Sequence, residues 1–146
     1  MTEITFLQRL QRLEDLQAIQ QLFIDYGHHL DAGDFAAYAG LFARDGTVQL
    51  GPIGKAQGRD AIQDLLEKAL RAQVGSTYHL INGPRISLEG DQASSEVMWT
   101  VLKRDPHGLP TVMATGRHRD NLVREDGQWR FKSRRGFVDL PATMKV

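Results

Sequence analysis

The chain has 146 residues, with 18 basic and 18 acidic side chains that cancel, five histidines and no cysteine. This length suits one domain with a sizeable core and is too short for two, so we expect a single domain over residues 1–146. The balanced charge gives no reason to expect nucleic acid or an anionic membrane as a partner, and a hydrophobic small molecule fits better. The lack of cysteine excludes a disulfide framework, a thiolate nucleophile and cysteine-ligated metal sites.

The N-terminal segment MTEITFLQRLQRLEDL is interrupted by charges and has no continuous apolar run. It matches neither a signal peptide nor a membrane span, so we expect a cytoplasmic protein. Apolar residues then recur at spacings of three and four, which predicts one long amphipathic helix with a buried stripe. The stripe consists of Leu7, Leu10, Leu13, Leu16, Ile19, Leu22, Phe23, Tyr26 and Leu30.

A glycine marks the end of this helix, because Gly33 suits a left-handed cap, and Asp34 can then cap a short second helix over residues 35–42. Asp45-Gly46 turns the chain into a short strand, followed by a loop over residues 51–58. A third amphipathic helix is predicted from residue 61 to residue 70.

Beyond Gly75 the apolar pattern changes to a period of two, which is typical of strands. Four long strands are predicted, at about 77–88, 92–104, 111–124 and 128–140, joined by turns rich in glycine and aspartate. Helices first and an antiparallel sheet after them is the order of the α+β class.

Alternation along the strands predicts which side chains face the helices. In the last strand it places Arg135 and Phe137 on the apolar face and leaves Arg134 on the solvent side. A guanidinium on the apolar face needs an anion or a polar partner, since burying it alone costs several kcal/mol. A structural ion pair with Asp31 or Glu96 is an equally good way to satisfy it.

The two preceding strands supply walls for a pocket. His118 shares a face with Ala114 and Gly116, and Trp99 shares a face with small residues such as Ser95. Small side chains beside an aromatic wall leave room for a ligand. Plain core packing is the alternative for Trp99.

Asp31, at the end of the long helix, and His79, in the first long strand, are the candidate acid–base pair. A carboxylate that fixes one ring nitrogen orients an imidazole and makes it a stronger base, as proton abstraction from carbon requires. The alternatives are a satisfied core histidine and a solvated aspartate, although the helix dipole disfavours an anion there. Tyr26 lies about 140° from Asp31 on an ideal helix, so both reach one cavity only if the helix end unwinds.

The order of these features resembles the SnoaL-like branch of the nuclear transport factor 2-like superfamily over nearly the whole chain. The matching stretches are residues 13–26, 30–35, 41–46, 58–62, 78–82, 90–93 and 126–131. The resemblance implies an α+β fold of the cystatin-like kind, in which a cone-shaped, curved antiparallel sheet wraps around three N-terminal helices and holds a pocket inside.

Within this superfamily the chain looks most like the group of scytalone dehydratase, lindane dehydrochlorinase and bile acid dehydratase. The resemblance implies that His79 removes a proton, that Asp31 orients it and that the Tyr26 hydroxyl stabilises an enolate. It also places the late-strand arginine of the group near Arg135, where it would hold a leaving hydroxide or halide. We therefore expect a cofactor-independent lyase, such as a dehydratase, or an isomerase acting on a hydrophobic, cyclic molecule: a polyketide, steroid or aromatic intermediate.

The expected pocket lining is His118, Trp99, Phe137 and Phe23. The second pocket histidine of scytalone dehydratase would fall near Lys103, and His118 on the neighbouring strand is the candidate replacement. The alternative from another class is a non-catalytic small-molecule binding or assembly subunit, such as the small subunit of a ring-hydroxylating dioxygenase.

We expect no cofactor and no metal, because the adjacent His28 and His29 point apart on a helix and lack a ligand spacing. The outer sheet face mixes apolar and charged residues, as interfaces do. Its apolar members are Met98, Leu102, Met113 and Val123. Family relatives associate through this sheet, so the resemblance implies a homo-oligomer, a dimer or a trimer.

Overall fold

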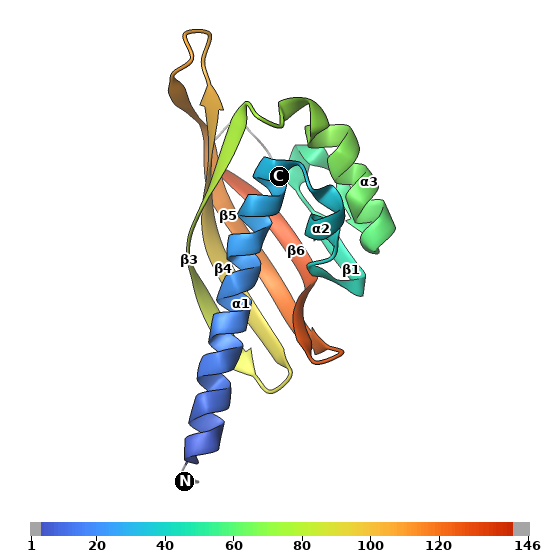
Figure 1. The fold of residues 1–146 in the computed structure, drawn as a ribbon, viewed down its shortest axis with the longest axis vertical. Helices are drawn as coiled ribbons and strands as arrows, with labels where there is room; N and C mark the ends of the chain where they lie inside the picture. The colour runs from blue at the N-terminus through green and yellow to red at the C-terminus, as the bar shows by residue number, and fades with distance from the viewer. Residues whose placement is uncertain (1–3, 142–146) are drawn as a thin grey trace.

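The computed structural model describes residues 4–141 and has the predicted α+β architecture (Figure 1). The helices are α1 (Phe6–Ala32), α2 (Phe35–Ala39) and α3 (Arg59–Leu70). The strands are β1 (Phe42–Gln49), β2 (Lys55–Gln57), β3 (Thr77–Glu89), β4 (Gln92–Arg104), β5 (Pro110–Glu125) and β6 (Gln128–Leu140). Two 3-10 turns, Gly51–Ile53 and Arg71–Gln73, complete the described elements.

The strands form one curved, open sheet in the order β2-β1-β6-β5-β4-β3. Every neighbouring pair is antiparallel except β1 and β6, which run parallel. Figure 1 shows α1 lying along the sheet face formed by β3, β4 and β5, with α2 and α3 over β1. The sheet thus wraps around the three helices, and the space between them is where a pocket can form.

Local caps fix both ends of α1, and the one at Gly33 is the one predicted. Thr5 and Gln8 form a capping box at the start, in which the main-chain N–H of Gln8 donates to the Thr5 hydroxyl oxygen at 3.1 Å. Gly33 closes the end with a φ of 71°, a left-handed value that glycine adopts without strain. Asp34 then caps α2 by accepting a hydrogen bond from the main-chain N–H of Ala37.

The first half of α1 does not have the buried stripe predicted for it. Leu7, Leu10 and Leu13 are 75%, 44% and 64% exposed, and burial of the apolar stripe begins only at Ile19. The helix continues past the end of the sheet, so no other element within residues 4–141 covers its first turns (Figure 1). None of the helices within residues 4–141 combines the length and apolar composition that crossing a membrane requires.

The second helix ends earlier than predicted, at Ala39. Phe42 begins β1 instead, where it is paired with Phe131 of β6 and fully buried. Pairing with a strand that is remote in sequence therefore overrides the helical spacing of the local apolar residues. The predicted loop after β1 also contains β2, which pairs back onto β1.

A β-bulge in β6 reverses the faces predicted for its two adjacent arginines. The pairing with β5 moves from Leu122–Phe131 to Asn121–Ser133, which leaves Lys132 without a partner. One extra residue shifts all later side chains to the other face of the sheet. Arg134 is therefore fully buried and Arg135 is exposed, so the prediction for this pair was wrong.

A second bulge in β5 changes the face of Met113. The pairing with β4 moves from Val101–Ala114 to Leu102–Val112, which leaves Met113 unpaired. Its side chain lines the interior cavity instead of contributing only to the outer face as predicted. Both bulges therefore aim side chains that strict alternation would send elsewhere.

Candidate active site

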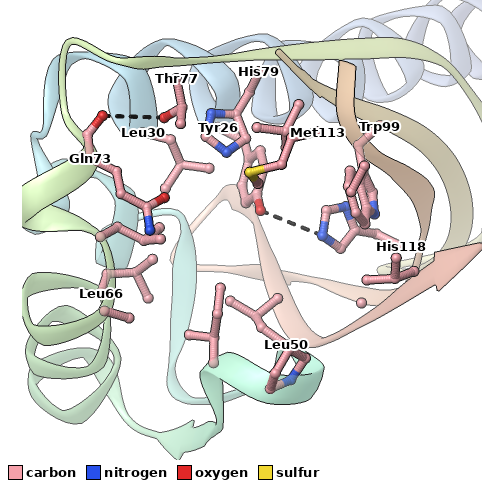
Figure 2. A pocket seen from close by; sticks show the side chains of 18 residues that line it. Tyr26, Leu30, Leu50, Leu66, Gln73, Thr77, His79, Trp99, Met113 and His118 are labelled. Carbon is pink, nitrogen blue, oxygen red and sulfur yellow. Dashed lines mark hydrogen bonds between the residues drawn. The ribbon is translucent and has the colours of Figure 1, made fainter. Parts of the chain in front are cut away.

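A cavity of about 230 Å³ lies inside the cone, between the helices and the concave face of the sheet (Figure 2). Most of its wall is apolar, which suits a hydrophobic ligand. The apolar lining includes Leu30, Leu50, Pro52, Ile53, Leu66, Leu70, Val101, Met113 and Val138. Its polar lining groups are Tyr26, Gln73, Thr77, His79, Trp99 and His118.

Asp31 and His79 are in direct contact. The Nδ1 atom of His79 lies 2.7 Å from Oδ1 of Asp31, and the main-chain N–H of His79 donates to the same oxygen at 3.0 Å. An ionised carboxylate can only accept, so Nδ1 donates to it, and in the neutral imidazole the lone pair is then on Nε2. The two hydrogen bonds also compensate the Asp31 charge, which the helix dipole disfavours at the end of α1.

The cavity and an outer groove lie on opposite sides of this pair. His79 lines the cavity, whereas Asp31 lies in the groove between α1 and β3. Their side chains are only 16% and 20% exposed, which limits competition from water for the contact. The geometry is that of an imidazole base oriented from behind by a carboxylate.

Tyr26 reaches the same cavity without any unwinding of α1. The helix is continuous through Ala32, and Tyr26 lines the cavity with 4% of its surface exposed. The helix end does not unwind, and Asp31 accordingly does not line the cavity; His79 extends from β3 to contact it. The helix therefore supplies the tyrosine from one face and the aspartate from another.

His118 lies beside Tyr26 at one end of the cavity, next to Trp99 (Figure 2). Its Nε2 atom is 3.5 Å from the Tyr26 hydroxyl oxygen. Burial, the positive charge of Arg134 and the nearby His79 hold the pKa of His118 well below its usual value. His118 is therefore neutral at physiological pH.

Arg134 lies beneath this end of the cavity and not in it. Its Nε atom is 2.9 Å from Oδ1 of Asp120, and both side chains are fully buried. The guanidinium stacks on the Tyr26 ring at 4.1 Å and on the Phe131 ring at 4.5 Å. Burial raises the pKa of Asp120, and the Arg134 charge opposes that shift.

Five of the eight residues chosen from the sequence meet at this site: Asp31, His79, Tyr26, His118 and Trp99. The other three do not line the cavity. Arg135 and Phe137 lie together on the outer face, 5.4 Å apart, because the bulge at Lys132 turns both outward. Phe23 is a core residue that packs against Phe131 and Arg134.

Sequence reasoning missed four residues at or beneath the site. Asp120 shares the inner face with His118, two residues earlier, so alternation carried a signal for it. No sequence signal marked Arg134 as buried, because the apolar pattern does not reveal the bulge. Gln73 and Thr77 lie at the opposite end of the cavity from His118 (Figure 2), and their position depends on a 3-10 turn that the pattern does not mark. Within the described residues, no group of three or more His, Asp or Glu side chains is placed to hold a metal ion.

A curved, open sheet wrapped around three helices, with a pocket inside, defines the cystatin-like α+β class. The sequence matches the family described as the SnoaL-like domain over residues 11–135, so the chain belongs to the SnoaL-like domain family. Among curated proteins, none matches the chain significantly.

Solved structures share this fold. A nuclear transport factor 2-like protein with a cystatin-like fold from Novosphingobium aromaticivorans is 24% identical, with a TM-score of 0.87 over 97% of this chain and 95% of that one. A candidate scytalone dehydratase from the same organism is 27% identical, with a TM-score of 0.73 over 88% of this chain and 87% of that one. The beta subunit of a candidate aromatic-ring-hydroxylating dioxygenase, again from this organism, is 22% identical, with a TM-score of 0.76 over 92% and 99%. The resemblance inferred from sequence is confirmed at the level of family and fold.

Proposed function

We propose that the protein is a cofactor-independent lyase, such as a dehydratase, or an isomerase that removes a proton from a carbon next to a carbonyl group. The observation that carries this proposal is the 2.7 Å contact between His79 and Asp31, with His79 also facing an apolar cavity. A base oriented in this way, in a site that limits water, suits abstraction of a weakly acidic C–H proton.

Each residue has a defined part in the reaction. The Nε2 lone pair of His79 takes the proton, and Asp31 holds the imidazole in position and stabilises the charge that forms. The electron pair of the broken C–H bond moves onto the carbonyl oxygen, where the Tyr26 hydroxyl donates a hydrogen bond to the enolate. In a dehydratase the enolate then expels the β-hydroxyl group, which takes up the proton held by His79 and leaves as water; in an isomerase His79 returns that proton to another carbon.

The cavity limits the size of the substrate. Its volume of about 230 Å³ is below the roughly 300–1,000 Å³ of sites that hold drug-sized ligands. We infer a substrate of one or two rings, which disfavours a four-ring steroid. Polar groups at both ends, His118 with Tyr26 on one side and Gln73 with Thr77 on the other, suit an oxygen at each end of that molecule (Figure 2).

The relatives support this class of reaction. The candidate scytalone dehydratase is 27% identical over most of both chains. Arg134, and not Arg135, is the arginine of β6 on the inner face of the sheet. It lies under the Tyr26 ring and pairs with Asp120. The proposal therefore assigns no arginine to the leaving group.

The test is turnover of a panel of one- and two-ring β-hydroxyketones and activated ketones, followed by NMR in deuterated water. We expect exchange or elimination of the proton next to the carbonyl. His79→Gln should reduce the rate by about 100-fold or more, because general-base catalysis contributes at least that much. His28→Gln, at an exposed histidine outside the cavity, is the matched control and should keep the wild-type rate.

The second candidate function is a non-catalytic binding or assembly subunit of the same fold. The observation that favours it is the exposed apolar face at the start of α1, where Phe6 is 77% exposed. Tight binding of the panel without any proton exchange or product would favour this alternative and would contradict the lyase proposal.

A further inference from the structure

Tyr26 is the point where several buried groups converge. His118 Nε2 lies 3.5 Å from its hydroxyl oxygen, and the guanidinium of Arg134 lies 4.1 Å from the centre of its ring. The Tyr38 ring packs on another side, with a centroid distance of 5.1 Å. Because the Tyr26 hydroxyl also borders the cavity, these neighbours control what it offers to a ligand.

The direction of the Tyr26 hydrogen depends on the tautomer of His118. A neutral imidazole has one N–H and one lone pair. If the proton is on Nε2, His118 donates to the Tyr26 oxygen and the Tyr26 hydrogen is free to point into the cavity. If it is on Nδ1, the Nε2 lone pair accepts the Tyr26 hydrogen in competition with a ligand.

The surroundings of Nδ1 favour the first arrangement. Nδ1 of His118 and Nε1 of Trp99 are both buried, and neither has a hydrogen-bond partner among residues 4–141. The two rings are neighbours, with centroids 5.9 Å apart (Figure 2). A proton on Nδ1 would therefore add a second buried N–H without an acceptor beside that of Trp99, which costs more than leaving a lone pair there.

Arg134 acts on the same hydroxyl from below. A cation over the face of a phenol ring stabilises negative charge on its oxygen and so makes the O–H a stronger donor. Burial raises the pKa of Tyr26, and Arg134 opposes that rise. The other charged or titratable groups around Tyr26 are Tyr38 on α2, His79 on β3 and Asp120 on β5.

We propose that His118 and Arg134 are positioning residues for Tyr26: His118 donates from Nε2 to the Tyr26 oxygen, which directs the Tyr26 hydrogen into the cavity, and Arg134 strengthens that hydrogen as a donor. The ligand group that this end of the cavity takes is then the carbonyl or enolate oxygen of a ring. The inference rests on the proposed function for its role in catalysis, but its geometry can be tested without turnover.

The first experiment measures the tautomer by ¹⁵N NMR of histidine-labelled protein, with the His118 signals assigned by their loss in His118→Phe. We expect a protonated Nε2 and an unprotonated Nδ1 at neutral pH. A proton on Nδ1, or on both nitrogens, would overturn the proposal whatever the protein catalyses.

The second experiment uses 2-naphthol as the probe, since its two rings fit the inferred size and its oxygen can accept a hydrogen bond from Tyr26 as a carbonyl or enolate oxygen would. His118→Phe should bind the probe roughly tenfold more weakly, because Tyr26 loses the neighbour that directs its hydrogen. His118→Gln, whose amide also donates, should bind the probe with an affinity closer to that of wild type. The control His28→Gln should bind it as tightly as wild type. Tighter binding by His118→Phe, or no binding by wild type, would contradict the proposal.

The third experiment isolates Arg134. The double variant Arg134→Met with Asp120→Asn removes both buried charges together, which avoids leaving one unpaired. The pKa of Tyr26, followed by ¹³C NMR of labelled tyrosine and assigned with Tyr26→Phe, should rise. An unchanged pKa in a folded double variant would refute the part assigned to Arg134. If the NMR results agree with the proposal and no turnover is found, the lyase function alone fails.

Discussion

The buried pair of Arg134 and Asp120 allows a stability prediction whose size follows from the structure. Neither side chain has exposed surface, and Arg134 contacts three aromatic rings besides its partner. Arg134→Met leaves Asp120 as an unpaired buried charge, which costs about 3–5 kcal/mol of the free energy of unfolding. Adding Asp120→Asn removes that charge, so the double variant should recover to within about 1–2 kcal/mol of wild type.

The loss of unfolding free energy caused by Arg134→Met should also depend on pH. Burial raises the pKa of Asp120 in the folded state, and losing Arg134 removes the charge that opposes the rise. The folded state then binds a proton more tightly than the unfolded chain, so stability is greatest below the unfolded pKa of about 3.9 and falls as pH rises through the folded pKa. The variant should therefore be closest to wild type in acid.

Urea unfolding followed by tryptophan fluorescence measures both effects. Arg135→Met is the matched control, because Arg135 is exposed and its replacement should change stability by no more than about 0.5 kcal/mol. A cost below about 1 kcal/mol for Arg134→Met, or a larger cost for Arg135→Met, would show that the bulge at Lys132 does not place these arginines as described.

Three further predictions concern the site and the assembly. Asp31→Asn should lower the turnover number by about 100-fold with little change in KM, because the amide no longer fixes the correct tautomer of His79. A rise in KM as large as the fall in the turnover number would contradict this role. Gly116→Ala should lower the melting temperature sharply, because its Cβ would lie 2.7 Å from the ring of Trp99, whereas Gly83→Ala meets no atom within 4 Å and should not. Met98→Glu, on the 55% exposed outer-face methionine, should dissociate the proposed homo-oligomer, and sedimentation of the wild type as a 16.4 kDa species would refute that oligomer.

The fold could be inferred from the sequence because it depends on features that are local, whereas the contact between Asp31 and His79, 48 residues apart, was implied by the family resemblance. Helical and strand periodicities are read over short windows, and the order of short stretches identified the family. The helix cap at Gly33 also followed from local chemistry. These features need no knowledge of how distant segments pair.

The exposed start of α1 shows what periodicity cannot supply. The spacing of Leu7, Leu10 and Leu13 correctly indicates an apolar helical face, but their burial depends on whether another surface reaches that face. The sheet ends before it reaches these first turns of α1 (Figure 1). A pattern therefore predicts the shape of a segment more reliably than its neighbours.

The two bulges are the places where alternation failed, and both shape the candidate site. Each adds one unpaired residue, Met113 in β5 and Lys132 in β6, and so changes the alternation of faces along its strand. The first leaves the Met113 side chain lining the cavity, and the second buries Arg134 beneath Tyr26. A strictly regular β6 would have buried Arg135 and Phe137 in place of Arg134. The electrostatics of this end of the cavity therefore depend on one extra residue in the last strand. A prediction that assumes regular alternation along the strand cannot locate such a residue.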